Sequence, residues 1–267
     1  MENNSESKYN LKTSDYAVLL IVGLFYYIDF LPNFRAIEIR GVQFLYMALL
    51  NLIIGVSFFA FPKFVNSDII GIFKKSLFVK MFIAFLGLSL LSIIASRNAG
   101  LVLVVFSQLL VLTIMIFNLC ILLYGRLHVF YHICFMIGVF SLVKCFTEIT
   151  LLFEQLKTGS LRTAITFLKG NTGNINIFSA SLNVKMPFLI LGIMHFQNWK
   201  KWILILSIIF STIIIYLLDS RATLLALILE VIAIVGFLVW KSADRKKIQL
   251  NVIATILPII IGVSIGV

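Results

Sequence analysis

The run GLVLVVFSQLLVLTIMIFNLCILLY, residues 100–124, contains no charged side chain. About 20 apolar residues in an α-helix cross a membrane core about 30 Å thick. The run is therefore long enough to span a bilayer, and it predicts a transmembrane helix. The rest of the chain has the same character, because 61% of its 267 residues are hydrophobic and only 12% are charged. Soluble domains carry about 25% charged residues, so this composition excludes a soluble globule, a disordered chain and a disulfide scaffold.

Further apolar runs on both sides of this stretch predict an all-α, polytopic transmembrane bundle with about nine spans. The fifth run, 128–153, contains Lys144 and Glu148, and an earlier end near Phe146 is an alternative for this span. Between the spans, segments 66–76 and 154–173 mix apolar and polar residues and are expected to form short interfacial helices. The nine predicted spans are 16–34, 42–61, 77–95, 100–124, 128–153, 174–196, 202–219, 221–240 and 248–267.

The net charge of +11 indicates membrane orientation, because the basic residues lie in short gaps between apolar runs. Twelve Lys and Arg residues fall in the N-terminal tail and alternate gaps, and seven fall in the other gaps. Cytoplasmic loops carry the excess of Lys and Arg, so the N-terminus is predicted to be cytoplasmic. Residues 1–15 are then a retained cytoplasmic tail and 16–267 the transmembrane domain. The bilayer is the expected partner, and no nucleic acid is expected.

Neither the cysteines nor the histidines have the spacing of a metal site, and we expect no cofactor. Each cysteine lies inside an apolar run, which predicts free, buried thiols. The histidines fall near the predicted cytoplasmic ends of two spans, where interfacial packing is the expected role. The cysteines are Cys120, Cys134 and Cys145, and the histidines are His128, His132 and His195.

Ionisable residues inside the predicted spans cost free energy there and therefore mark polar sites. Counted from the outer ends of their spans, Lys185 lies roughly 16 Å and Glu230 roughly 13 Å deep at the rise of an α-helix. Their matched depth and opposite charge suggest a buried ion pair. Separate contacts of each residue to backbone or water are an equal alternative. Lys144 and Glu148 are four residues apart on one helix face, where they are expected to neutralise each other.

Two further segments are more specific than composition. Together, in this order and with one span between them, they resemble the O-antigen ligase/polymerase superfamily of bacterial membrane glycosyltransferases. Lys185 and Ala222 depart from the usual family pattern. The first segment is Gly173-Asn174-Ile175-Asn176 followed by Ala180, Leu182 and Pro187, and the second is Ser220-Arg221-Ala222-Thr223-Leu224-Leu225-Ala226.

The resemblance implies a metal-independent transferase of the bacterial inner membrane that acts in lipopolysaccharide or other surface polysaccharide biosynthesis. Its donor is an undecaprenyl-diphosphate-linked glycan, and its acceptor is lipid A-core, a growing polymer or a protein on the periplasmic side. Ligase and polymerase are not distinguished. The family places its catalytic base on a large outer loop, which here would lie beyond Val267, so we expect the chain to be an N-terminal portion.

The chemistry of the two segments suits such a donor. Asn174 and Asn176 stand at a predicted helix start, where they can cap free N–H groups and also face a polar ligand. Arg221 offers planar, bidentate donors for phosphate at another helix start. Ser220 is expected beside it, and Lys169 and Arg162 are candidates for a second phosphate contact.

Three hypotheses remain open at this point. Besides the transferase, a polytopic transporter or flippase for a lipid-linked or anionic substrate would use Lys185 and Glu230 as its coupling or substrate site. A transporter is expected to contain an internal repeat or paired broken helices, and neither is clear in the sequence. The third hypothesis is a non-catalytic membrane scaffold. In the alternative interpretation of Arg221, its side chain simply extends to the membrane surface beside Asp219.

Overall fold

The computed structural model describes residues 11–32, 39–62, 67–241 and 245–266, and every regular element in these ranges is a helix. The predicted all-α fold class is confirmed. Within these ranges, seven helical segments are long and apolar enough to cross a membrane, which makes the chain a multi-pass membrane protein. These segments are Thr13–Phe30, Gly41–Ala60, Leu77–Ala95, Ala99–Leu123, Leu127–Leu156, Ile175–His195 and Trp199–Leu217.

The two remaining predicted spans also correspond to helices. They are α11 (Arg221–Lys241) and α12 (Arg245–Gly266), and the apolar part of α12 is Asn251–Gly266. The count of nine spans and the cytoplasmic N-terminus stay predictions. Residues 1–10 of the predicted tail lie outside the described residues.

The chain divides into two compact units, of which the first comprises residues 1–130. In this unit α2 packs against α5 through two buried asparagines: Asn118 Nδ2 donates to Asn51 Oδ1 at 3.0 Å, and Asn51 Nδ2 donates to the Val111 carbonyl at 3.1 Å. By contrast, α4 buries none of its residues, as expected of a helix that faces lipid. The helices of this unit are α1 (Thr13–Tyr26), η2 (Tyr27–Phe30), α2 (Ile39–Ala60), α3 (Ser67–Lys75), α4 (Leu77–Ala95) and α5 (Ala99–Leu123).

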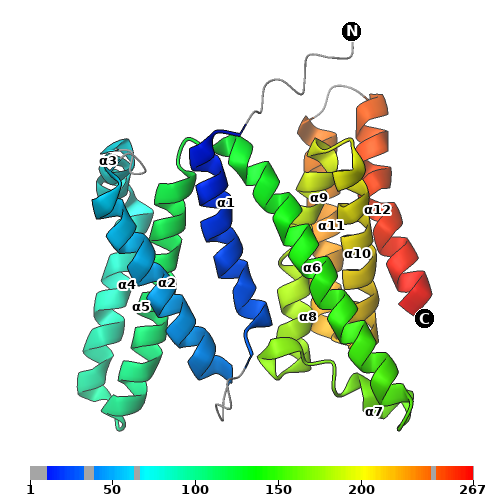
Figure 1. Cartoon of the computed structure of the whole chain (residues 1–267), viewed down its shortest axis with the longest axis horizontal. Helices are drawn as coiled ribbons and strands as arrows, with labels where there is room; N and C mark the ends of the chain where they lie inside the picture. The colour runs from blue at the N-terminus through cyan, green and yellow to red at the C-terminus, as the bar shows by residue number, and fades with distance from the viewer. Residues whose placement is uncertain (1–10, 33–38, 63–66, 242–244, 267) are drawn as a thin grey trace. The chain divides into compact units, whose positions relative to one another are not determined.

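The second unit, residues 131–267, is built around α10, which contacts α8, α9, α11 and α12 (Figure 1). Its side chains Leu204, Ile208 and Ile214 have no exposed surface. A Cβ on Gly262 of α12 would lie 2.8 Å from the Ile209 carbonyl of α10, so glycine permits this close approach. Besides α11 and α12, the helices of this unit are α6 (Leu127–Leu156) from residue 131 onward, α7 (Leu161–Ile165), η4 (Gly170–Thr172), α8 (Ile175–Asn183), α9 (Met186–His195) and α10 (Trp199–Leu217).

The predicted fifth span, 128–153, corresponds to α6, which continues to Leu156. The alternative end near Phe146 is therefore wrong. The charges of Lys144 and Glu148 do not interrupt α6, since they pair with each other at 3.1 Å on one helix face. The segments between spans do contain short helices, as expected: α3 within 66–76, and α7 and η4 within 154–173.

The predicted span 174–196 is a broken helix rather than a continuous one. α8 ends at Asn183 and α9 begins at Met186, with Val184 and Lys185 between them. The cause is Pro187, which has no N–H to donate to the carbonyl of Asn183 and whose ring crowds that carbonyl. The break therefore lies in the middle of the span, at Lys185 and directly after Asn183.

Candidate functional site at the starts of α8 and α11

The side chain of Asn174 caps the first turn of α8. Its Oδ1 accepts hydrogen bonds from the backbone N–H groups of Asn176, at 2.8 Å, and Ile177, at 3.3 Å. Asn174 itself has the extended backbone typical of an N-cap. The predicted capping role of Asn174 is therefore confirmed. Asn176 lies in the first turn with an exposed side chain, so its amide is accessible from outside the unit.

A tight turn leads into this cap. The Thr172 hydroxyl lies 2.7 Å from the carbonyl of Lys169 and 2.9 Å from that of Asn174, and it accepts from the Asn174 N–H at 3.3 Å. Gly173 has φ +68°, a left-handed conformation that glycine adopts at little cost. The glycine and threonine thus set the direction in which the chain enters α8.

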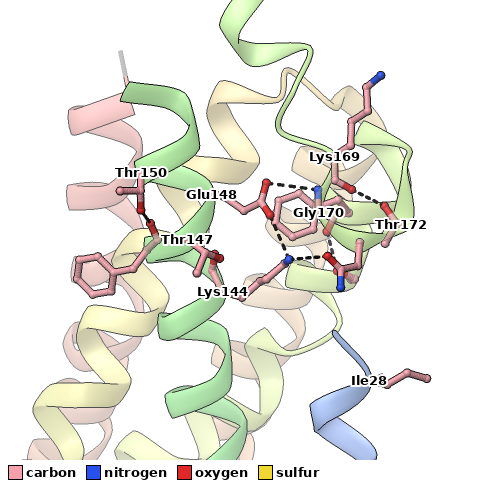
Figure 2. Close-up of polar contacts among 12 residues, drawn as sticks. Ile28, Lys144, Thr147, Glu148, Thr150, Lys169, Gly170 and Thr172 are labelled. Atoms are coloured by element: carbon pink, nitrogen blue, oxygen red, sulfur yellow. Dashed lines mark hydrogen bonds and ion pairs between the residues drawn. The ribbon is translucent and has the colours of Figure 1, made fainter. Parts of the chain in front are cut away.

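The turn is anchored to α6 by the charged pair on that helix, as Figure 2 shows. Lys144 Nζ donates to Asn171 Oδ1 at 3.2 Å, and the Gly170 N–H donates to Glu148 Oε2 at 3.3 Å. Lys144 and Glu148 therefore do more than neutralise each other, because they hold η4 against α6. Gly170 is required there: it has φ +54°, and a Cβ would lie 2.6 Å from the ring of Phe178.

The second segment forms the turn between α10 and α11. Asp219 has φ +46° and reverses the chain after α10. The Ser220 hydroxyl is buried and lies 2.9 Å from the Thr223 hydroxyl. Arg221 begins α11 with an exposed side chain. Within the described residues no hydrogen bond or ion pair engages its guanidinium, including none to the neighbouring Asp219.

The two segments lie at the same end of this unit. α8 and α11 are in contact, and Asn183 Nδ2 donates to Glu230 Oε1 at 3.0 Å. Asn183 is roughly 12 Å beyond the start of α8, and Glu230 roughly 14 Å beyond the start of α11, at the rise of an α-helix. Both helices run away from this end (Figure 1), so their starts, with Asn176 and Arg221, are level with each other.

The other candidate phosphate contacts are less closely tied to this end. Lys169 lies directly before η4 and Arg162 lies on α7, both with exposed side chains. Within the described residues, no hydrogen bond joins either of them to Asn176 or Arg221. Their role as a second phosphate contact stays a prediction.

Deeper between α8 and α11, the structure gives Glu230 a neighbour that the sequence interpretation did not name. The partner that donates to Glu230 is Asn183, whereas the predicted ion pair of Glu230 with Lys185 stays a prediction. The sequence signal for Asn183 was weak: a single amide within an apolar run, seven residues after Asn176 and two before Lys185.

Smaller expectations have mixed outcomes. Cys134 and Cys145 are buried and all three cysteines are free, but Cys120 is exposed, so that part of the expectation is wrong: it faces outward from α5. His195 stacks on Tyr131 with ring centroids 3.7 Å apart, which confirms a packing role.

Asp15, at the end of the predicted tail, lies instead in the first turn of α1. Its side chain is buried in the first unit, 2.9 Å from His128 Nε2. Arg126 Nε lies 3.8 Å from the same carboxylate. His128 therefore pairs with a carboxylate rather than merely packing, a contact between residues far apart in the sequence.

None of the described residues forms a cluster of three or more His, Cys, Asp and Glu side chains suited to a metal ion. Among protein-family models, curated proteins and solved structures, none matches this chain. The resemblance to the O-antigen ligase/polymerase superfamily therefore rests on the residues of the two segments.

Proposed function

We propose that this protein is a membrane glycan ligase or polymerase of the O-antigen ligase type. It transfers a glycan from undecaprenyl diphosphate to a lipid or glycan acceptor on the periplasmic face of the bacterial inner membrane. One observation carries the proposal. The exposed guanidinium of Arg221, which has no hydrogen bond or ion pair within the described residues, lies at the start of α11, level with Asn176 at the start of α8.

The charge of a lipid diphosphate matches this arrangement. The N-terminus of a helix favours anions, and a guanidinium can bind two phosphate oxygens at once. Because the guanidinium of Arg221 lacks a partner among the described residues, binding a diphosphate breaks no existing ion pair. The polyprenyl tail of the carrier would remain in lipid beside the apolar surfaces of the helices.

The roles of the residues follow from their positions. Arg221 holds the diphosphate, which is the leaving group, and stabilises the charge that develops on it during transfer. Asn176 donates to the same group or to the first sugar, while Asn174 keeps the first turn of α8 in place through its cap. Lys169 and Arg162 supply the further cationic contacts.

The decisive experiment removes the guanidinium in a strain deleted for the native gene. We expect Arg221→Ala to reduce glycan transfer by about 10²-fold or more, as for other charge-stabilising donors. Arg221→Lys recovers little, since a lysine cannot bind bidentately. Lys157→Ala is the matched control, because it removes an exposed cation outside the site. Normal transfer by both Arg221→Ala and Asn176→Ala, at unchanged protein levels in the membrane, would refute the assignment.

Orientation is tested separately. Lys157→Cys, in a background with Cys120→Ser, should react with a membrane-impermeant maleimide added outside spheroplasts. Labelling only after the membrane is permeabilised would place this end of the helices in the cytoplasm and exclude a periplasmic transferase.

One observation favours a transporter or flippase instead. The break between α8 and α9, with Lys185 in it and Asn183 beside it, is the kind of discontinuity in which transporters bind substrates and ions near the membrane midplane. A transporter would move its substrate across sealed vesicles, and Lys185→Ala would abolish that movement. A transferase instead forms a glycosidic product without net transport.

A further inference from the structure

Asn183 and Glu230 share one hydrogen bond and each leaves one oxygen without a partner. Asn183 Nδ2 donates to Glu230 Oε1 at 3.0 Å. The remaining oxygens, Asn183 Oδ1 and Glu230 Oε2, are both buried, and neither has a hydrogen-bond partner among the residues that the structure describes. The two orphaned atoms therefore belong to the same two side chains that are already joined.

The protonation state of Glu230 decides whether these atoms can be satisfied. An ionised carboxylate can only accept hydrogen bonds, as can the amide oxygen of asparagine. If Glu230 is ionised, two acceptors remain buried side by side with no donor. A protonated carboxyl has one O–H donor. A proton on Glu230 Oε2 therefore lets this oxygen donate to Asn183 Oδ1, and both oxygens then take part in a hydrogen bond.

We propose that Glu230 binds a proton within the membrane, with its Oε2–H donating to Asn183 Oδ1. The acid and the amide then form a cyclic pair with two hydrogen bonds, one in each direction, between α8 and α11. Only a proton is added to Glu230, and no bond between heavy atoms forms or breaks. The pair is uncharged, so it avoids the cost of an isolated charge at this depth.

The surroundings agree with a neutral pair. On the two helices, Leu182 has no exposed surface and Leu227 is 3% exposed, so the pair lies among apolar side chains. The other elements with the most extensive contacts to α8 or α11 are η4, α10 and α12. α10 has no charged residue between Lys201 and its end, α12 has none after Lys247, and η4 lies near the helix starts.

Two sets of charged groups remain nearby in the unit. Lys185, in the break after α8, is the cation next to Asn183 in the sequence. The Lys144–Glu148 pair on α6 is engaged with Gly170 and Asn171. The two hypotheses therefore predict different protonation states of Glu230. Glu230 is protonated and uncharged in the pair with Asn183, and it is ionised in an ion pair with Lys185.

The proton site has a consequence for the end of the unit. Because the pair fixes the register of α8 against α11, it keeps Asn176 and Arg221 level. This positioning does not depend on what binds there, so the proton site stands or fails independently of the proposed transferase function.

Infrared difference spectroscopy on the whole chain in lipid nanodiscs tests the proposal directly. At pH 7, the wild-type spectrum minus that of Glu230→Gln should contain the C=O stretch of a protonated carboxyl, which shifts in D₂O. Asn183→Ala should move this band to higher frequency because the acid loses its partner. Ser207→Ala is the control: Ser207 is also buried and without a partner, but lies on α10, so the band should not change.

Thermal unfolding gives an independent readout. Glutamine can donate to Asn183 Oδ1 and accept from Asn183 Nδ2, so Glu230→Gln should unfold within about 2 °C of wild type, whereas Glu230→Ala should lose about 4 °C or more. Carboxylate bands in place of the acid band overturn the proposal and favour the ion pair with Lys185. So does failure of Glu230→Gln to fold, because an uncharged pair tolerates that replacement.

Discussion

Removal of the Glu148 carboxylate is the sharpest test of how the candidate site is held in place. Glu148 is 2% exposed and Lys144 is 8% exposed, so the pair is shielded from water. Glu148→Ala removes both the ion pair and the acceptor of the Gly170 N–H. The turn that precedes α8 then loses one of its anchors to α6.

The size of the effect follows from the geometry. Opposite unit charges 3.1 Å apart attract by about 5 kcal/mol at an effective dielectric constant of about 20. Desolvation of the two groups offsets most of this attraction, so the intact pair contributes little net stability. Removing one partner costs about 3–5 kcal/mol, because it leaves the other charge buried and unpaired. Lys144 keeps its contact with Asn171, and we therefore expect a loss of about 3 kcal/mol.

Thermal unfolding of the purified protein measures this loss as a decrease in Tm of about 6–12 °C, given about 2–4 °C per kcal/mol for a chain of this size. The double variant Lys144→Met/Glu148→Leu removes both charges and fills the same space. It should recover most of the Tm, since apolar residues often replace a buried ion pair without loss.

Two outcomes would refute this reasoning. A decrease in Tm below about 2 °C for Glu148→Ala would mean that Lys144 is not left as a buried charge. A double variant that is less stable than Glu148→Ala would mean that the pair itself is strongly stabilising. A matched control is Glu154→Ala on the same helix, whose side chain is exposed and whose loss should change the Tm little.

Two further changes test the turn and the cap. Gly170→Ala should destabilise the protein by about 1–3 kcal/mol because of the positive φ, and further because its Cβ would lie 2.6 Å from the Phe178 ring. The double variant Gly170→Ala/Phe178→Leu should recover part of the loss in Tm. No recovery would mean that the ring does not cause the additional loss. Asn174→Ala should cost about 0.5–2 kcal/mol by removing the cap of α8, whereas Asn174→Asp should retain most of the stability. Equal Tm values for the two Asn174 variants would contradict the capping role.

Local interactions in the sequence predicted much of this protein. Apolar runs identified the helices because the bilayer penalises each polar residue where it stands, irrespective of what lies elsewhere in the chain. The cap at Asn174 and the pair Lys144–Glu148 were also predictable from local sequence, because in each case the interacting groups lie within four residues along one helix. These features needed only helix geometry.

Errors arose where a local rule met a competing one. Lys144 and Glu148 favoured an end near Phe146 as an alternative to the predicted span 128–153, but their mutual pairing lets α6 continue to Leu156. The apolar run 174–196 predicts one continuous span, but Pro187 breaks it before α9, because proline has no N–H for the carbonyl of Asn183 and its ring crowds that carbonyl.

From the sequence it follows that this chain is a helical, multi-pass membrane protein with polar residues inside its spans. Which residues those polar groups contact depends on how the helices pack: Asn183 donates to Glu230, the Gly170 N–H donates to Glu148, and Arg221 lies level with Asn176. The physical reason is range. Hydrophobicity and helix capping act within a few residues, whereas a hydrogen bond between two helices depends on their register and rotation, which the packing of the whole unit sets.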